Sequence, residues 1–285
     1  MSRSYVFWNS QSGKRGKEGL ESLKAKLNDD ELDIADVINF AGYREYLSDI
    51  KGDDKIYIVG GDGTLNRFVN ETDGMNITND VYYYPAGTGN DFLRDINTPP
   101  EKCPVKINKY ITDLPFVEVN GKKYRFLNGI GYGIDGYCCE VGDKMKAEGA
   151  DNINYTSIAI KGLLFHYQPT GCVITVDGKK YEYKKVWLCP TMNGRFYGGG
   201  MMATPGQDRL NKEHTLSSML FYGKGRLRTL MAFPSIFKGE HIAHKDMVAI
   251  HTGKDITVEF DRPTALQIDG ETVLGVTKYR AYSAK

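Results

Sequence analysis

The stretch that decides the fold is Lys55-Ile56-Tyr57-Ile58-Val59-Gly60-Gly61-Asp62-Gly63-Thr64, an apolar strand followed at once by glycines and one acid. Glycines at this point let the backbone approach a phosphate, and a helix predicted over 65–71 adds its positive N-terminal end to the same place. Asp62 repels phosphate by itself, so an acid here fits a Mg²⁺ ion or a hydroxyl group near phosphates. A tight turn with Asp62 as a helix N-cap explains the same residues about equally well.

Two further turns follow predicted strands. Strand 81–84 runs into Pro85-Ala86-Gly87-Thr88-Gly89-Asn90-Asp91, and strand 5–8 runs into Asn9-Ser10-Gln11-Ser12-Gly13-Lys14. Because parallel strands end at one edge of a sheet, the three turns are expected to share one crevice. A simpler interpretation of the turn Pro85–Asp91 is that Asn90 or Asp91 caps a short helix. The turn Asn9–Lys14 lacks the spacing of a P-loop.

The pattern of elements predicts two domains and an α+β fold overall. In the first part strands alternate with helices, which indicates a parallel sheet, whereas Asn120-Gly121 and Asp177-Gly178 mark antiparallel hairpins in the second. We expect an α/β domain over 1–115 and a largely antiparallel, β-sandwich-like domain over 116–274. Whether 275–285 complete the first domain stays open. Expected strands are 5–8, 36–40, 55–59, 81–84, 116–119, 124–126, 172–176, 181–183, 215–222, 256–260, 265–268 and 276–282; expected helices are 17–27, 43–50, 65–71, 153–166 and 226–237.

Composition excludes several classes of function. Lys and Arg number 37 against 36 Asp and Glu, so the chain lacks the basic excess on which nucleic-acid binding depends. No apolar run approaches the roughly 18–20 residues that span a bilayer, and the first residues are too short for a signal peptide. Five irregularly spaced cysteines predict neither a disulfide framework nor a metal cluster. We expect a cytoplasmic protein that is at most peripheral to a membrane.

Five motifs occur in order along nearly the whole chain. They are Gly60–Thr64 with Leu65 and Asn66, Pro85–Asp91, Asn128–Asp135, Gly198–Met201 with Pro205, and Asp269-Gly270-Glu271. Together they resemble the diacylglycerol kinase catalytic-domain family of bacterial type, which is related to sphingosine kinases. The first motif alone would also fit NAD kinases or phosphofructokinases.

The resemblance implies an NAD-kinase/diacylglycerol-kinase-like α/β domain and a β-sandwich, with an active site in the cleft between them. It implies transfer of the γ-phosphoryl group of ATP, with Mg²⁺, to the hydroxyl of diacylglycerol or a similar lipid. By analogy Asp62 orients the phosphates and Mg²⁺, Glu271 is the general base beside Asp269, and Asp135 contacts the lipid head group. From the residues alone, Asp269-Gly270 is a hairpin signal, and Glu271 is expected to be a solvent-facing acid in that turn.

The same analogy implies a set of nucleotide-binding residues: Asn9, Ser12, Gly13, Lys14, Gly60, Gly61, Gly63, Thr64, Asn66, Gly87, Thr88, Asn90 and Asp91. The implied partners are a lipid substrate at a membrane surface and, since dimers are common among such proteins, a second copy of the chain.

Two departures from the family pattern matter. Ser10 replaces the usual proline after Asn9, and Arg209–Leu216 replaces a segment whose acids hold a structural Mg²⁺ in some members. We expect that metal site to be lost or rebuilt through Asp208. The segment 224–233 interleaves basic and apolar residues, which fits either a bilayer surface or an ordinary helix with a solvated edge.

Two alternatives remain at the level of sequence. An NAD kinase shares Gly60–Gly63, but the motifs at Pro85–Asp91 and Gly198–Met201 favour a lipid kinase. A non-catalytic regulator that binds nucleotide or lipid is supported only by the altered segment 209–216, whereas Asp62 and Glu271 argue against it.

Overall fold

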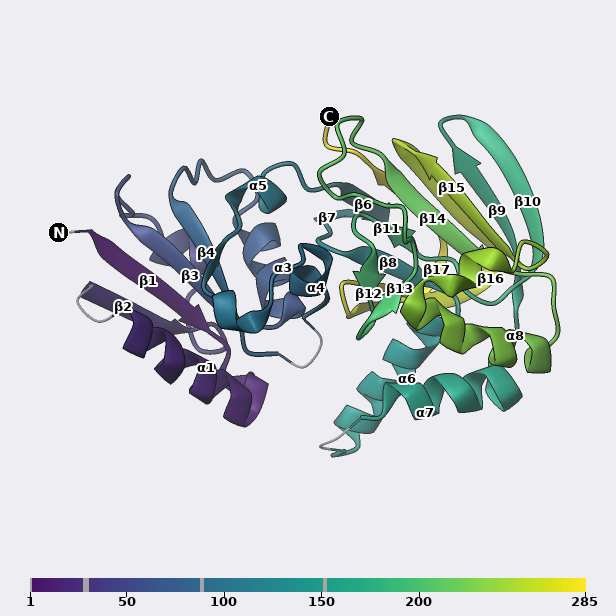
Figure 1. Ribbon diagram of the computed structural model, residues 1–285, viewed down its shortest axis with the longest axis horizontal. Coiled ribbons are helices and arrows are strands. Elements are labelled where there is room, and N and C mark those ends of the chain that lie inside the picture. The colour runs from purple at the N-terminus through teal and green to yellow at the C-terminus, as the bar shows by residue number, and fades with distance from the viewer. Residues whose placement is uncertain (1, 28–30, 88–89, 151–152) are drawn as a thin grey trace. The chain divides into compact units, whose positions relative to one another are not determined.

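The computed structural model describes residues 2–27, 31–87, 90–150 and 153–285 and divides the chain into two compact units, Met1–Asp113 and Leu114–Lys285 (Figure 1). The first unit carries a five-stranded sheet in the order β2-β1-β3-β4-β5. The first four strands are parallel, and only β5 is antiparallel. The strands are β1 Arg3–Trp8, β2 Glu31–Asp36, β3 Lys55–Gly60, β4 Asp80–Pro85 and β5 Val105–Lys106.

Helices cover both faces of this sheet, as the strand–turn–helix pattern predicts. On one face Leu20 and Leu23 of α1 pack against Val6, Tyr57 and Val59. On the other face aromatic side chains of α2 and α3 pack around Phe7, which contacts Tyr43. The helices of the unit are α1 Gly13–Lys26, α2 Tyr43–Tyr46, α3 Asp62–Glu71, α4 Asp91–Asp95 and α5 Asn108–Ile111, with short 3-10 turns η1 Ser10–Ser12 and η2 Pro100–Lys102.

One predicted strand of this unit is wrong. The sequence analysis expected a strand over 36–40, but β2 spans Glu31–Asp36 and the chain turns at the following residues. β2 lies at the edge of the sheet and is partly exposed, so its sequence Glu-Leu-Asp-Ile-Ala-Asp carries no apolar run. The expected helix over 43–50 is also shorter, because α2 ends at Tyr46.

The second unit is built on a ten-stranded, largely antiparallel sheet, which confirms the predicted fold class. Its main path is β15-β14-β11-β8-β16-β17-β6-β7, and β9 pairs with both β10 and β16. The strands are β6 Phe116–Val119, β7 Lys122–Arg125, β8 Gly129–Tyr132, β9 Thr170–Val176, β10 Lys179–Val186, β11 Thr191–Met192, β14 Leu216–Phe221, β15 Val248–Gly253, β16 Asp255–Ile268 and β17 Glu271–Tyr282; β12 Phe196–Tyr197 and β13 Met201–Met202 form a separate pair.

The last two strands differ from what the sequence predicted or left open. β17 pairs with β16 and β6, so 275–282 belong to the second sheet and not to the first. The expected strands 256–260 and 265–268 are two parts of the single long strand β16. Both Asx-Gly hairpins form, with positive φ at Asn120 and at Asp177.

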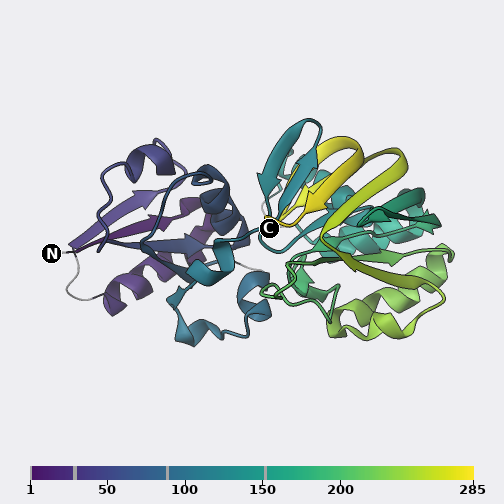
Figure 2. The same cartoon turned by 90° about the horizontal axis from the view of Figure 1, so that it is seen from above.

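Helices gather on one side of the second sheet (Figures 1 and 2). They are α6 Ile134–Ala147, α7 Tyr155–Lys161, the π-helical turn η3 Gly162–His166, α8 Arg226–Ala232 and the 3-10 turns η4 Phe233–Lys238 and η5 Glu240–Ala243. The sequence analysis did not predict α6. Their apolar core, which includes Leu163 and Ile236, meets Trp187 and Phe221 of the sheet. A second core, around Tyr132 and Phe260, consists mainly of apolar side chains from the strands of the sheet.

No helix among the described residues is long and apolar enough to cross a membrane.

Gly136 sets the distance between α6 and the sheet. A Cβ at this position would lie 1.8 Å from the carbonyl oxygen of Ala265 on β16. We predict that Gly136→Ala lowers the free energy of unfolding by about 3 kcal/mol, because the helix must move away from the strand. Urea unfolding measures the loss. Gly206→Ala is the matched control, since its Cβ would meet no described atom within 4 Å; equal stability of the two variants would contradict the prediction.

Candidate active site

The strand ends of the first unit bring the three predicted turns to one edge of the sheet. β1 lies between β2 and β3, so the chain connections reverse direction at the ends of β1 and β3. Ligands of open α/β sheets bind outside the strand ends at such a switch point. Asn9, Gly61 and Gly87 all follow strand ends at this edge. The sequence analysis expected them to lie together.

Two glycine turns touch backbone to backbone. A Cβ on Gly87 would lie 2.5 Å from the Cα of Gly61, so a side chain at Gly87 would separate the turns. The amide of Ala86 donates to the Gly60 carbonyl at 2.8 Å, and the buried hydroxyl of Tyr83 donates to the same oxygen at 3.0 Å. The contact requires glycine because of close approach, and it fixes the turn that leads into α3.

Asp62 links the two turns. Its Oδ2 accepts hydrogen bonds from the amides of Asp91 at 2.7 Å and Phe92 at 3.4 Å, at the start of α4. The carboxylate therefore caps a helix 29 residues further along the chain, whereas the sequence analysis considered a cap only for the helix that follows it. Burial, and next the charge of Asp62, raise the pKa of the neighbouring Tyr83 well above its ordinary value. Asn90 adopts a left-handed backbone conformation, and its side-chain amide donates to the Gly87 carbonyl at 3.3 Å.

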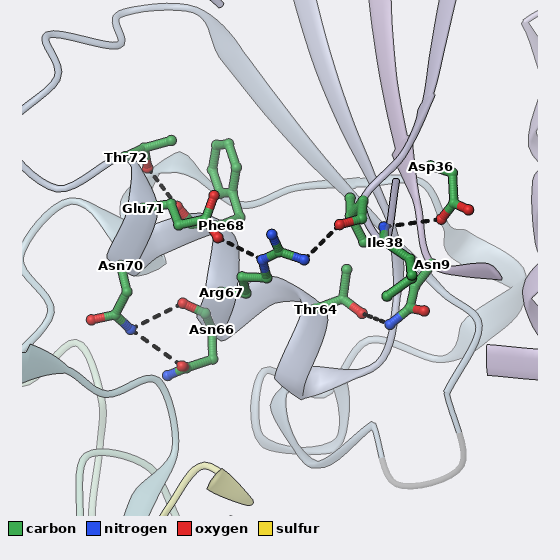
Figure 3. Close-up of polar contacts among 11 residues, drawn as sticks. Asn9, Asp36, Ile38, Thr64, Asn66, Arg67, Phe68, Asn70, Glu71 and Thr72 are labelled. Atoms are coloured by element: carbon green, nitrogen blue, oxygen red, sulfur yellow. Dashed lines mark hydrogen bonds and ion pairs between the residues drawn. The ribbon is translucent and has the colours of Figure 1, made fainter. Parts of the chain in front are cut away.

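The turn after β1 is fastened to α3. The Asn9 side-chain amide donates to the Thr64 hydroxyl at 3.2 Å (Figure 3). The Ser10 backbone amide donates to Asp36 at 3.2 Å, which ties the same turn to the end of β2. Asn66, two residues further along α3 than Thr64, accepts hydrogen bonds from Asn70 on the same helix. These contacts hold the residues expected to bind nucleotide in a defined conformation.

Some expected residues point elsewhere or lie outside the described residues. Lys14 is on the exposed face of α1, with a side chain that is 88% exposed and pairs with Glu18 at 3.5 Å. Ser12 precedes α1 without a side-chain capping bond. Thr88 lies outside the described residues. For Ser12, Gly13, Lys14 and Thr88, binding of nucleotide remains a prediction from the sequence.

In the second unit the carboxylate of Asp269 holds the start of the Asn128–Asp135 motif. It accepts hydrogen bonds from the backbone amides of Leu127, Asn128 and Gly129, the last two at 2.8 and 3.0 Å. Asp269 and Gly270 both have positive φ and form the turn between β16 and β17. Asn193 adds a further bond from its amide to the Leu127 carbonyl at 3.0 Å. Three segments far apart in sequence therefore meet at one loop.

Glu271 begins β17, directly after this turn, and is exposed. Its position in the strand is set by pairing with Ile268 across the hairpin. Burial, and to a smaller degree nearby carboxylates that include Glu271, raise the pKa of Cys139 on α6 to about 12, so this thiol stays protonated at neutral pH. The structure thus presents an accessible carboxylate directly beside the turn of this hairpin.

Asp135 is the buried carboxyl of the same region. It lies in the first turn of α6 and accepts a hydrogen bond from the hydroxyl of Tyr197. Burial raises the pKa of Asp135 to about 7, and the bond from Tyr197 offsets part of that rise. Tyr197 ends β12, directly before the turn Gly198–Gly200, in which all three residues have positive φ. The triple glycine therefore orients the partner of Asp135.

Asp208 and Arg209 occupy the segment in which the family pattern is altered. Asp208 is exposed and accepts a hydrogen bond from the Leu210 amide at 2.9 Å, as in an ordinary turn. The guanidinium of Arg209 donates to the Asn128 side chain at 3.0 Å. Among the described residues no group of three His, Cys, Asp or Glu side chains is arranged to hold a metal ion. A metal site rebuilt through Asp208 therefore stays a prediction, for which the described residues show no set of three such ligands.

Tyr83 and Tyr197 are the functional-site residues that sequence reasoning missed. Tyr83 joins two turns, and Tyr197 donates a hydrogen bond to Asp135 that offsets part of the rise in the pKa of that carboxyl. Tyr83 stands in a run of three tyrosines, so nothing local distinguishes it. Tyr197 directly precedes a triple glycine, which was the available signal.

An α/β unit with glycine turns at its strand ends, followed by an antiparallel β unit, is the fold class that the resemblance to diacylglycerol kinases implies. Comparison with known families agrees with this class. The diacylglycerol kinase catalytic domain matches residues 3–114, and the YegS C-terminal NAD kinase beta sandwich-like domain matches residues 128–280. The chain belongs to the diacylglycerol kinase catalytic-domain family.

Individual relatives are distant. The chain is 26% identical over 253 residues to the "Putative lipid kinase YtlR" of Bacillus subtilis (strain 168), covering 81% of this chain and 77% of that protein. It is 26% identical over 216 residues to a diacylglycerol kinase of Mycobacterium tuberculosis, covering 73% and 68%. A crystal structure titled "a putative diacylglycerol kinase from Bacillus anthracis str. Sterne" superposes with a TM-score of 0.69 at 20% identity, covering 99% of this chain and 92% of that one.

The buried carboxyl of Asp135 makes stability depend on pH. Between the unfolded pKa of 3.8 and the folded value of about 7, the folded protein holds one more proton, so raising the pH favours unfolding. We predict that Asp135→Asn raises the free energy of unfolding at about pH 8, by at most about 4 kcal/mol, and flattens its fall from acid to neutral pH. Urea unfolding across this range measures it. Asp143→Asn, an exposed change on the same helix, serves as control, and an unchanged slope in Asp135→Asn contradicts the prediction.

Proposed function

We propose that the protein is an ATP-dependent lipid kinase that transfers the γ-phosphoryl group to a hydroxyl of diacylglycerol or a similar lipid alcohol. The observation that carries the proposal is the contact of the Gly61 and Gly87 turns, locked by Asp62, at the sheet edge where α3 begins. The first amides of a helix have no partner within it, and with the helix dipole they favour a phosphate. Membership of the diacylglycerol kinase family supports the same reaction.

The residues of the first unit fit a nucleotide phosphate. Side chains are absent where the turns meet, and a Cβ at Gly63 would meet no described atom within 4 Å. Asp62, Thr64 and Asn66 are polar side chains of the first turns of α3. A Mg²⁺ ion bound with the nucleotide would neutralise charge on the transferred group. Since the described residues offer no preformed cluster of three ligands, such an ion would take most of its ligands from phosphate and water, with Asp62 as the protein carboxylate.

The reaction needs a base that accepts the proton of the lipid hydroxyl group. The lipid hydroxyl oxygen attacks the γ-phosphorus, the bond from that phosphorus to the β-phosphate oxygen breaks, and ADP leaves. We assign the hydroxyl proton to the Glu271 carboxylate, which is accessible and held on the hairpin that Asp269 anchors. We assign Asp135 and Tyr197 to the lipid head group, because a carboxyl that is protonated up to about pH 7 donates as well as accepts a hydrogen bond.

Turnover is the first test. Labelled ATP and Mg²⁺ are supplied with mixed micelles that contain diacylglycerol or, separately, a panel of other lipid alcohols. We predict transfer to a lipid hydroxyl and a loss of about 100-fold or more in kcat for Glu271→Gln, which removes the base from an exposed position. Glu259→Gln, another exposed glutamate of the same hairpin, is the control and keeps full activity.

The outcomes separate the alternatives. Transfer to a lipid other than diacylglycerol keeps the mechanism and changes the acceptor. Binding of ATP without transfer to any acceptor refutes the kinase proposal and supports a nucleotide-binding regulator.

The role of Asp62 is tested by two substitutions with different effects. Asp62→Asn keeps an oxygen that accepts the Asp91 amide but removes the charge, whereas Asp62→Ala removes both. We predict that both variants lose at least about 100-fold in kcat, because the charge serves the phosphates and their ion. Only Asp62→Ala should also lose about 1 kcal/mol of stability through the missing helix cap. Full activity of a folded Asp62→Asn would restrict Asp62 to a structural role.

A further inference from the structure

Exposed apolar side chains concentrate on the helical layer of the second unit. The described residues include twelve large hydrophobic side chains that are exposed. Seven of these lie within 153–166 and 226–243, the segments that form α7, η3, α8, η4 and η5. Scattered exposed apolar residues are ordinary, but a concentration on one layer marks an interaction surface.

Helix α8 shows how this surface is built. Thr229 and Ala232 are buried against the unit, whereas Leu227 and Met231, four positions apart and therefore on one face, are 66% and 68% exposed. Phe165 of η3 is 69% exposed. η3 is tied to α8 by the guanidinium of Arg226, which donates to the Leu163 carbonyl at 2.8 Å. Two adjoining elements thus place three large apolar side chains in water.

Cations surround these side chains. The segments 160–166, 184–185 and 224–238 contain seven Lys or Arg residues and no Asp or Glu, in a chain whose net charge is only +1. The amide of Gly223 donates to the carbonyls of Lys184 and Lys185 at 3.1 Å, which brings the end of β10 to the start of α8. Asp246 pairs with Lys224 at 3.1 Å and Arg228 at 2.7 Å, and Glu240 of η5 is a further exposed acid of the helical layer. The surface stays basic after that pairing.

We propose that this surface, the α8 face, docks on an anionic lipid bilayer. We define it by the apolar residues Phe165, Leu227 and Met231 and the cations Lys184, Lys185 and Arg228. Apolar side chains that enter the interfacial region and cations that meet anionic head groups are the two signals that together give stable peripheral binding. A second copy of the chain fits less well, because the contact would bring two basic faces together.

The proposal gives the lipid kinase assigned above a way to reach its acceptor, and in that sense it rests on the proposed function. Its test does not, since binding to a bilayer needs neither ATP nor turnover. The docking residues are also separate from Asp62, Asp135 and Glu271.

Vesicle flotation tests the proposal directly. We expect the protein to float with vesicles of equimolar phosphatidylcholine and phosphatidylglycerol, to bind pure phosphatidylcholine much more weakly, and to dissociate as salt rises. The double substitution Leu227→Ser with Met231→Ser should weaken binding roughly tenfold or more. Lys184→Ala with Lys185→Ala should weaken it by about fivefold for each lysine.

Two controls match these variants. Leu274→Ser changes a leucine that is 60% exposed on β17, and Lys122→Ala changes a lysine on β7, a strand that pairs with β6 and not with β10. Both should float like the unchanged protein. With short-chain diacylglycerol dispersed in detergent, the double serine variant should keep full turnover.

Three results would overturn the proposal. The first is absence of flotation with the anionic vesicles at low salt. The second is equal flotation of the serine variant and its Leu274→Ser control. The third is a dimer in solution that the serine substitutions dissociate, which would assign the α8 face to a second copy. If turnover fails with every acceptor while flotation behaves as expected, the kinase assignment falls and the docking surface stands.

Discussion

A carboxylate that accepts backbone amides from a distant segment is the interaction on which each unit's site depends. Asp269 holds three consecutive amides at 127–129, and from that loop the chain continues through β8 to Asp135. Asp62 holds the start of α4 and thereby keeps two glycine turns in contact. Bonds from amides to a charged acceptor are strong, and leaving such amides unpaired is expensive. The aspartates thus fix the backbone of the loops on which the candidate catalytic groups stand.

The sequence predicts the fold well where burial dictates it. β1, β3 and β4 lie inside the parallel sheet, so their apolar runs are unmistakable, and Asn120 and Asp177 mark hairpins because their turns need positive φ. β2 was misplaced because an edge strand need not be apolar. Helix α6 was missed because glycines at 136 and 142, which bring it close to Ala265 and Tyr155, hide its helical character. In both cases a tertiary contact overrides the local signal.

The sequence predicts the motifs of the candidate site but not the contacts that their side chains make with distant residues. Glycine turns after strands predict a phosphate site from local residues alone. A single sequence gives no sign that Asp62 caps a helix 29 positions away, or that Tyr197 bonds to Asp135, because these pairs form only when the chain folds. For Lys14 the sequence suggests phosphate binding because a cation stands beside a glycine turn, and the structure adds that its side chain is exposed on α1 and pairs with Glu18.

The two carboxyls of the second unit differ in a way that suits different tasks. Glu271 is accessible on a hairpin end, whereas Asp135 is buried and keeps its proton up to about pH 7. A buried carboxyl lowers stability once it ionises, so at neutral pH Asp135 weakens the fold that contains it. A neutral side chain of the same shape would avoid that loss and still accept the bond from Tyr197. An acid at this position fits the head-group role proposed above, because a half-protonated carboxyl can either donate to or accept from an uncharged hydroxyl.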